Sequence, residues 1–137
     1  MDKIPPERRS ENMRRIKSGD TSPEMLVRRT VHGMGYRFRL HGRNLPGKPD
    51  LVFAGRRKVI FVNGCFWHCH EDPECKIARL PKSNRDYWLP KLERNKHRDA
   101  ENIKALKEDA WEVLTVWECE TVDREFLKST LTEFLDS

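Results

Sequence analysis

The chain has 137 residues, of which 36% are charged and 36% hydrophobic, and its mean hydropathy is -0.84. No apolar run is long enough for a membrane span, and the N-terminus lacks the apolar segment of a signal peptide, so we expect a cytoplasmic protein with one main domain. Residues 1–60 carry 15 basic and 6 acidic side chains, whereas residues 61–137 carry 12 and 16. This asymmetry favours nucleic acid as the partner, with a solvated basic surface as the alternative.

Two helices are expected in the first third of the chain. Basic residues surround Met13 and Ile16 over residues 7–18, which predicts a short amphipathic helix with too few apolar residues for a core position. Thr21 and Glu24 have capping-box spacing, and this predicts a helix from Thr21 to about Gly33. Alternating or continuous apolar patterns then predict strands. These strands occupy residues 36–40, 50–54 and 58–63, the last of them central and buried on both faces.

The second half of the chain begins with an irregular segment rich in Cys, His and Pro over residues 64–82. A long helical pattern follows over residues 83–107, and we expect its continuous part to start near Pro90. A strand over residues 110–118 and a closing helix over residues 121–135 complete the chain. The order of elements predicts an α/β fold with a mixed sheet flanked by helices. The apolar positions of the long helical pattern are Tyr87, Trp88, Leu92, Ile103 and Leu106, and we assign Trp111 and Trp117 of the last strand to the core.

Asp50 is the first candidate functional residue. It begins a strand directly after the Gly- and Pro-containing loop at residues 45–49, where a metal ion could reach it. A hairpin of strands 50–54 and 58–63 would also make Asp50 and Val62 neighbours. Turn chemistry explains most Pro-Asp pairs, so the motif by itself leaves catalytic and structural readings open.

Cysteines and histidines are concentrated in one short segment. The members of this set are Cys65, His68, Cys69, His70, Cys75 and the distant Cys119. Without a sign of secretion, such spacing favours Zn²⁺ over disulfides, although buried reduced cysteines are the alternative. More ligand candidates are present than a tetrahedral ion needs, which leaves one or two side chains for other work.

Aromatic and charged residues near that segment suggest a DNA-facing surface. Phe66, Trp67 and Trp88 lie in a context of Cys, His, Arg and Lys residues, where they could stack on or wedge between bases. A core position is the alternative for each of them. Glu24 and Asp99 are further candidates for acid–base work, but sequence spacing does not show whether they meet His68.

Taken together, these motifs resemble the very short patch repair (Vsr) family of DNA mismatch endonucleases. GCFWH at residues 64–68 and VWEC at residues 116–119 are its most specific segments. The further matching stretches are NMRRI at 12–16, DTSPE at 20–24, LPGKPD at 45–50, VIFV at 59–62, RLPKS at 79–83 and WEVL at 111–114. The resemblance implies a restriction-endonuclease-like fold and an enzyme that nicks DNA 5′ of the thymine in a T:G mismatch left by deamination of 5-methylcytosine.

The resemblance also implies a catalytic centre with Mg²⁺ as cofactor. Asp50 and the main-chain carbonyl of Val62 would hold the ion. His68 would act as general base or acid, Asp99 would orient it, and Glu24 would hold a metal-bound water. Asn63 stands where family members have His or Asp, so its part in catalysis is open.

A structural Zn²⁺ is implied at four residues near the aromatic segment. The implied ligands are Cys65, His70, Cys75 and Cys119. Four residues separate His70 from Cys75, more than we expect for the family, and Cys69 is an extra thiol beside His70. Cys69 is therefore an alternative ligand. We favour His70, because adjacent side chains in an extended loop seldom point the same way.

The expected partner is double-stranded DNA with a T:G mismatch. Residues 1–19 would form a basic arm on DNA, and residues 20–137 would form the nuclease domain. The residues expected to contact DNA are Met13, Arg14, Arg15, Phe66, Trp67, Lys82, Trp88 and Asn95. The resemblance further implies a functional link to a cytosine-5 DNA methyltransferase, contacts with mismatch-repair and repair-polymerase proteins, and a location at the nucleoid. A zinc-stabilised DNA-binding module without catalysis, and a related nuclease of different specificity, are the alternatives.

Overall fold

A computed structural model describes residues 21–65, 68, 70, 75 and 85–137 of the chain. The predicted basic helix over residues 7–18 lies outside these residues. The described elements are α2 (Ser22–Gly33), β1 (Arg39–Leu40), β2 (Leu51–Phe53), η1 (Ala54–Arg56), β3 (Lys58–Asn63), α3 (Arg85–Glu108), β4 (Glu112–Trp117), η2 (Glu118–Val122) and α4 (Arg124–Leu135). None of the helices in this part of the chain has both the length and the apolar character needed to cross a membrane.

The four strands form one mixed sheet in the order β1-β2-β3-β4. β1, β2 and β3 are joined as an antiparallel meander, in which Leu51 pairs with Leu40 on one side and Ile60 on the other. β3 and β4 are parallel, a pairing that requires a crossover connection, and α3 lies on that connection. β3 is therefore an inner strand, as its apolar sequence predicts, and its first three residues are buried.

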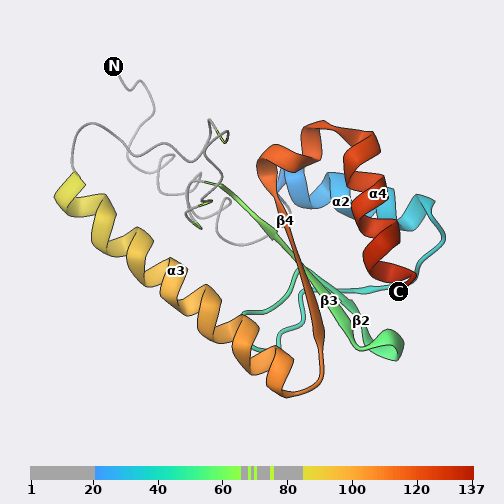
Figure 1. The fold of residues 1–137 in the computed structure, drawn as a ribbon, viewed down its shortest axis with the longest axis horizontal. Helices are drawn as coiled ribbons and strands as arrows, with labels where there is room; N and C mark the ends of the chain where they lie inside the picture. The colour runs from blue at the N-terminus through green and yellow to red at the C-terminus, as the bar shows by residue number, and fades with distance from the viewer. Residues whose placement is uncertain (1–20, 66–67, 69, 71–74, 76–84) are drawn as a thin grey trace.

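Helices cover both faces of this sheet. In Figure 1, α2 and α4 lie on one side of the strands and α3 lies on the other. Alternation along β3 sends Ile60 into a core with α2 and α4, and Val59 into a second core with Leu106 and Trp111 on the α3 side. The expected α/β class with a mixed sheet and flanking helices is confirmed. The restriction-endonuclease-like assignment stays a prediction, as does the division into residues 1–19 and 20–137.

The start of α3 differs from our expectation. We expected the continuous helix to begin near Pro90, but α3 begins at Arg85 and includes Pro90 as an interior residue. Proline lacks the N–H that would bond to the carbonyl four residues earlier, which here belongs to Asp86, at the first turn of the described helix. The missing hydrogen bond therefore lies in the first turns of the described helix, where its loss leaves the remaining intrahelical hydrogen bonds in place.

Two apolar residues of the predicted elements are exposed. Tyr87, an apolar position of the long helical pattern, is 55% exposed, and Leu40, from the strand predicted over residues 36–40, is 42% exposed. The strand predicted over residues 36–40 is shortened to Arg39–Leu40 at the sheet edge, where one face of Leu40 has no covering layer among the described residues. Trp117 is half-buried and stacks on His70, with ring centroids 4.2 Å apart, whereas Trp111 is a core residue as predicted.

A buried lysine fixes α4 on the sheet. Lys58, the first residue of β3, is 3% exposed. Its ammonium group donates to the carbonyl oxygens of Phe134, at 2.6 Å, and Ser137, at 3.0 Å. The last carbonyls of a helix lack intrahelical partners and attract cations, so Lys58 satisfies the end of α4 while its own charge is compensated.

Candidate active site and metal-binding clusters

Asp50 directly precedes β2, at the strand end where the sequence predicted a metal-binding carboxylate, and it lies beside Val62 of β3. Its Oδ2 accepts a hydrogen bond of 2.7 Å from the backbone N–H of Val62. Asp50 and Val62 are therefore neighbours, as expected, through a contact between a side chain and the main chain. The N–H and C=O of one strand residue point to the same neighbouring strand, so the Val62 carbonyl faces the side on which Asp50 lies.

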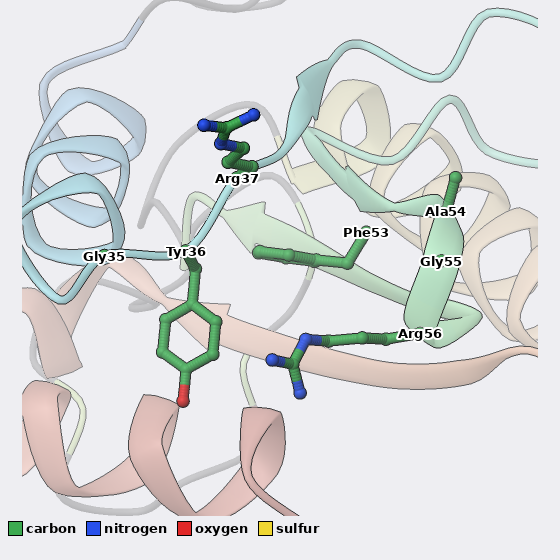
Figure 2. A pocket seen from close by; sticks show the side chains of 7 residues that line it. All are labelled: Gly35, Tyr36, Arg37, Phe53, Ala54, Gly55 and Arg56. Carbon is green, nitrogen blue, oxygen red and sulfur yellow. The ribbon is translucent and has the colours of Figure 1, made fainter.

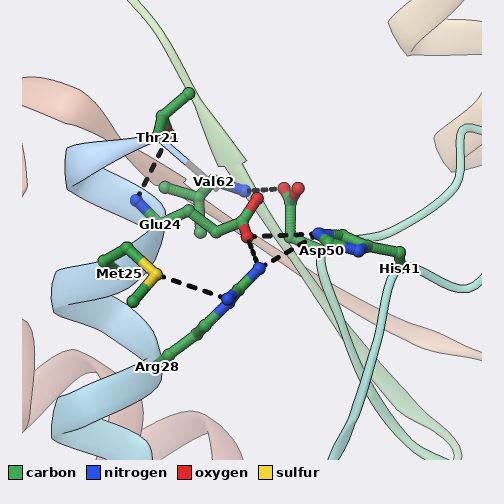
Figure 3. A network of polar contacts seen from close by, with 7 residues as sticks. All are labelled: Thr21, Glu24, Met25, Arg28, His41, Asp50 and Val62. Atoms are coloured by element: carbon green, nitrogen blue, oxygen red, sulfur yellow. Dashed lines mark hydrogen bonds and ion pairs between the residues drawn. The ribbon is translucent and has the colours of Figure 1, made fainter. Parts of the chain in front are cut away.

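Glu24 reaches the same point from α2. Thr21 caps this helix by accepting the N–H of Glu24 at 3.4 Å. The Glu24 side chain is only 1% exposed and turns toward the sheet, where it pairs with Arg28 and lies 3.2 Å from Nε2 of His41. Figure 3 shows Arg28 and His41 meeting the Glu24 carboxylate, with Asp50 bonded to Val62 beside them. Glu24 is thus a buried member of the site as well as a first-turn helix residue.

His41 and Arg28 belong to this cluster although the sequence did not single them out. Ligand atoms of Glu24, His41 and Asp50 all lie within 4.8 Å of one another. His41 directly follows β1, and its backbone N–H donates to the carbonyl of Asp50 at 3.0 Å. The β1–β2 register, which the sequence did not reveal, places residue 41 opposite residue 50.

Burial and like charge make the cluster an acidic site that favours a proton or a cation. Burial raises the pKa of Asp50, with a further contribution from the neighbouring Glu24 carboxylate. The Val62 amide and the Arg28 guanidinium oppose this effect, and the pKa is raised to about 8. Two carboxylates and one imidazole nitrogen suit a divalent cation, so the residues present fit the Mg²⁺ site that the sequence suggested.

His68 forms a second group with Asp99. Nδ1 of His68 contacts Oδ2 of Asp99, and each side chain is about one-third exposed. The backbone N–H of His68 donates to the carbonyl of Gly64, directly after β3. The predicted His68–Asp99 contact is therefore present. His68 is anchored just after the end of β3 near which Asp50 lies. With Nδ1 oriented by a carboxylate, Nε2 is the nitrogen available for proton transfer.

Asn63 and Val62 complete the end of β3. Asn63 is buried, with 8% exposure. Because side chains alternate along a strand, Asn63 is directed to the α3 side of the sheet, the side from which Asp99 comes. A catalytic part for Asn63 stays a prediction.

The second candidate cluster contains Cys65, His70, Cys75 and Cys119. All four ligand atoms lie within 4.8 Å of one another. Cys119 Sγ is 3.4 Å from Nδ1 of His70, and its backbone N–H donates to Sγ of Cys65 at 3.4 Å. Zinc–sulfur bonds of about 2.3 Å and zinc–nitrogen bonds of about 2.0 Å allow one tetrahedral ion to join such atoms. The donor set fits the predicted Zn²⁺ site.

Burial raises the pKa of Cys65 to about 12 and raises the pKa of Cys119. Such thiols are neutral unless a cation displaces their protons, and thiolates are the metal-binding form. Cys69, the alternative ligand, lies outside the described residues. His70 is positioned by its stacking on Trp117.

The predicted DNA-contact residues are only partly described. Trp88 and Asn95 are half-buried on α3, and Trp88 packs edge-on against Tyr87, with centroids 5.0 Å apart. Residues 88, 92, 95 and 99 fall on one helix face by their three- and four-residue spacing, which puts Trp88 and Asn95 in line with Asp99. The remaining expected contacts, Met13, Arg14, Arg15, Phe66, Trp67 and Lys82, lie outside the described residues.

A separate pocket of about 260 Å³ lies at the other end of β2 from Asp50. Figure 2 shows Tyr36 and Arg56 at its edge. Tyr36 pairs with Asp136, and Arg56 donates to the carbonyl of Leu135 at 2.9 Å. These side chains hold the end of α4, which indicates a structural role.

The fold and its two clusters define an α/β protein with a carboxylate–imidazole group near the end of an inner strand and a Cys₃His group that could hold a metal ion. The family DNA mismatch endonuclease Vsr matches residues 1–75. The type II nicking enzyme V.XorIIP of Xanthomonas oryzae pv. oryzae is 49% identical, over 98% of this chain and 97% of that protein. The DNA mismatch endonuclease Vsr of Escherichia coli K12 is 42% identical, over 93% and 81%. The chain belongs to the Vsr family of DNA mismatch endonucleases.

Proposed function

We propose that this protein nicks one strand of duplex DNA 5′ of the thymine in a T:G mismatch and so initiates very short patch repair. The observation that carries the proposal is the proximity of Asp50 and Glu24 near the end of β3, together with the His68–Asp99 pair on the segment that follows β3, in a member of this family. The mismatches would arise from deamination of 5-methylcytosine. The surrounding target sequence would then follow that of a cytosine-5 methyltransferase, and the protein would act at the nucleoid in the cytoplasm.

The His68–Asp99 pair supplies the proton-transfer group. Hydrolysis forms a phosphorus–oxygen bond to water and breaks the bond to a sugar oxygen, so one proton leaves the water and one reaches the leaving group. Nε2 of His68 takes the proton of the attacking water, and the leaving sugar oxygen takes its proton from solvent water. Asp99 holds Nδ1 and stabilises the imidazolium that forms.

Asp50, Glu24 and the Val62 carbonyl would hold Mg²⁺. Such an ion would supply positive charge for the scissile phosphate and would lower the pKa of a water molecule. Asp50 is oriented for this task by the Val62 N–H, and Glu24 by its burial against α2. The raised pKa of Asp50 supports the assignment, because a cation is what stabilises two carboxylates held so close.

The Cys₃His cluster positions the catalytic histidine. His68 lies between Cys65 and His70 in the sequence, and Cys119 connects this segment to the end of β4. A Zn²⁺ held by these residues would fix the path of the chain on both sides of His68. Its part is structural, and a His68 on an unfixed loop would lose its alignment with Asp99.

Mismatch recognition is assigned to the aromatic and basic residues. Phe66, Trp67 and Trp88 would wedge into the duplex beside the T:G pair, which unstacks at lower cost than a Watson–Crick pair. The basic arm, residues 1–19, would contact the opposite groove, with Lys82 and Asn95 adding backbone contacts. The support for this step is the position of Trp88 and Asn95 on the same α3 face as Asp99.

A nicking assay tests the proposal. Duplexes with one T:G pair in several sequence contexts are incubated with Mg²⁺ and the protein, beside their C:G parents. We expect a nick in the thymine strand of at least one mismatched duplex, no nick in the parents, and none with Asp50→Ala. Equal cutting of matched and mismatched duplexes would favour a nuclease of different specificity. Tight T:G binding without cutting in any context would favour the non-catalytic DNA-binding module.

A further inference from the structure

His41 is held against the catalytic carboxylates by the backbone. Its N–H donates to the Asp50 carbonyl at 3.0 Å, continuing the β1–β2 pairing beyond both strands. Its φ of 51° lies in the left-handed region, which is uncommon for a residue other than glycine and costs conformational energy. Backbone conformations of this kind persist where the surrounding structure enforces them, and they concentrate at functional sites.

The Nε2 atom of the His41 imidazole faces the centre of the cluster. It lies 3.2 Å from Oε2 of Glu24 and 3.1 Å from an Nη atom of Arg28. The Arg28 guanidinium thus contacts the Glu24 carboxylate and the His41 ring together. Glu24 and His41 therefore already bind one positively charged group at a common point (Figure 3).

The donor set differs from an all-oxygen site. A cation shared by Asp50, Glu24 and His41 would receive two carboxylate oxygens and one imidazole nitrogen, all within 4.8 Å of one another. Mg²⁺ prefers oxygen ligands and retains its waters, whereas imidazole is a good ligand for transition-metal ions. Mn²⁺ accepts both oxygen and nitrogen, so an added imidazole favours it over Mg²⁺.

We propose that His41 is a third protein ligand of the catalytic cation and that it sets the preference of the site for Mn²⁺ over Mg²⁺. The inference rests on the proposed function, in which Asp50 and Glu24 hold that cation. Nε2 of His41 would be a nitrogen ligand, and this ligand would favour Mn²⁺. Arg28 then balances the acidic cluster from the helix side, where it pairs with Glu24.

Direct metal binding tests this role. Mn²⁺ is titrated into the zinc-containing full-length protein, with the free ion followed by electron paramagnetic resonance, and Mg²⁺ affinity is obtained by competition. The variants are His41→Gln, which offers an amide oxygen in place of the nitrogen, and His32→Gln as the matched control. His32 is an exposed histidine near the end of α2, eight residues or about 12 Å along the helix from Glu24.

We expect His41→Gln to weaken Mn²⁺ binding by about tenfold or more, while Mg²⁺ binding changes by less than about twofold. Pulsed electron paramagnetic resonance of bound Mn²⁺ should show nitrogen-14 coupling in the wild type and in His32→Gln, and no such coupling in His41→Gln. An unchanged ratio of Mn²⁺ to Mg²⁺ affinity, or nitrogen coupling that persists in His41→Gln, would overturn the role of His41.

The failure of this inference can be separated from failure of the proposed function. If the wild type binds both ions and nicks the mismatched duplex, but His41→Gln behaves as the wild type does, only the assignment of His41 is wrong. If the wild type binds neither ion, with or without duplex DNA, and does not nick, the metal-dependent site itself is wrong and the inference falls with it.

Discussion

At the scale of single residues, the carboxylates of Glu24 and Asp50 are stabilised by their surroundings and not by each other. Glu24 is buried and pairs with Arg28. The negative charge of Asp50 is stabilised by the backbone N–H of Val62 and, through electrostatic attraction, by the Arg28 guanidinium. Ionising Asp50 beside the Glu24 carboxylate costs free energy, because two negative charges are then buried close together. The ionised pair therefore destabilises the folded protein unless a cation or a proton compensates it.

Replacing Asp50 should therefore stabilise the metal-free protein. The folded-state pKa of about 8 lies above the ordinary value of 3.8, so the folded state binds a proton more tightly than the unfolded chain does. Stability from this proton is fully present below the unfolded pKa and is lost as pH rises through the folded pKa. We expect Asp50→Asn to be more stable than the wild type by about 1–3 kcal/mol at pH 8, and nearly equal to it at pH 4.

Urea denaturation in Mg²⁺-free buffer at several pH values measures this difference. Adding Mg²⁺ should stabilise the wild type and leave Asp50→Asn unchanged. A variant that is less stable than the wild type at pH 8 would contradict the account of a destabilising carboxylate pair.

Asp99 should affect the rate and not the binding of DNA. Without the carboxylate on Nδ1, His68 loses its preferred tautomer and orientation, so we expect Asp99→Asn to slow nicking by about 10²-fold or more. Single-turnover nicking and a DNA-binding titration measure the two effects. Glu101→Gln is the control, because Glu101 pairs with the exposed His97 at 3.0 Å on the same helix. An equal effect of both substitutions would show that the His68–Asp99 contact has no special part.

At the scale of elements, the sequence predicts the strands better than the helix starts. β3 has the predicted bounds, because its run of β-branched and aromatic residues suits an inner strand. The limits of α3 were misjudged because Pro90 was read as a stop, whereas a proline one turn inside a helix removes only a bond at the frayed end. The position of His41 was missed, since cross-strand neighbours depend on a register that no local pattern gives.

The interior proline of α3 provides a prediction at this scale. Pro90 is exposed and lies on a helix that carries Asp99 and Trp88. Alanine restores the missing N–H and has a far better helix propensity, so we expect Pro90→Ala to stabilise the protein by about 1–3 kcal/mol. Thermal unfolding followed by circular dichroism measures the change. A loss of stability would show instead that the proline fixes the chain as it enters the helix.

At the scale of the whole molecule, the Cys₃His cluster brings together the segment after β3 and the segment after β4. Cys65 follows β3 and Cys119 lies in η2, directly after β4, while His70 and Cys75 come from the intervening segment. The spacing of cysteines and histidines indicated a metal site, and the resemblance to the Vsr family implied these four residues. The contact between Glu24 and Asp50 was not predicted, since it depends on how α2 packs against the sheet.

Zinc should be present and should stabilise the fold. We expect about one Zn²⁺ per chain in freshly purified, reduced protein, and loss of both the ion and more than about 3 kcal/mol of stability in Cys119→Ser. Elemental analysis and denaturation measure these quantities. His70→Ala should also lose the ion, whereas Cys69→Ala should retain it. The opposite result for these two variants would assign the fourth position to Cys69.

The central claim is strand-specific incision at a mismatch by the Asp50 centre, and mapping the cut tests it most directly. One duplex with a single T:G pair is labelled differently on each strand and incubated with Mg²⁺ and the protein, and the fragments are sized to single-nucleotide resolution. The account predicts one product, cut at the phosphate 5′ of the thymine, in the thymine strand, with no product from Asp50→Asn. A cut in the guanine strand, a cut elsewhere, or undiminished cutting by Asp50→Asn would contradict it.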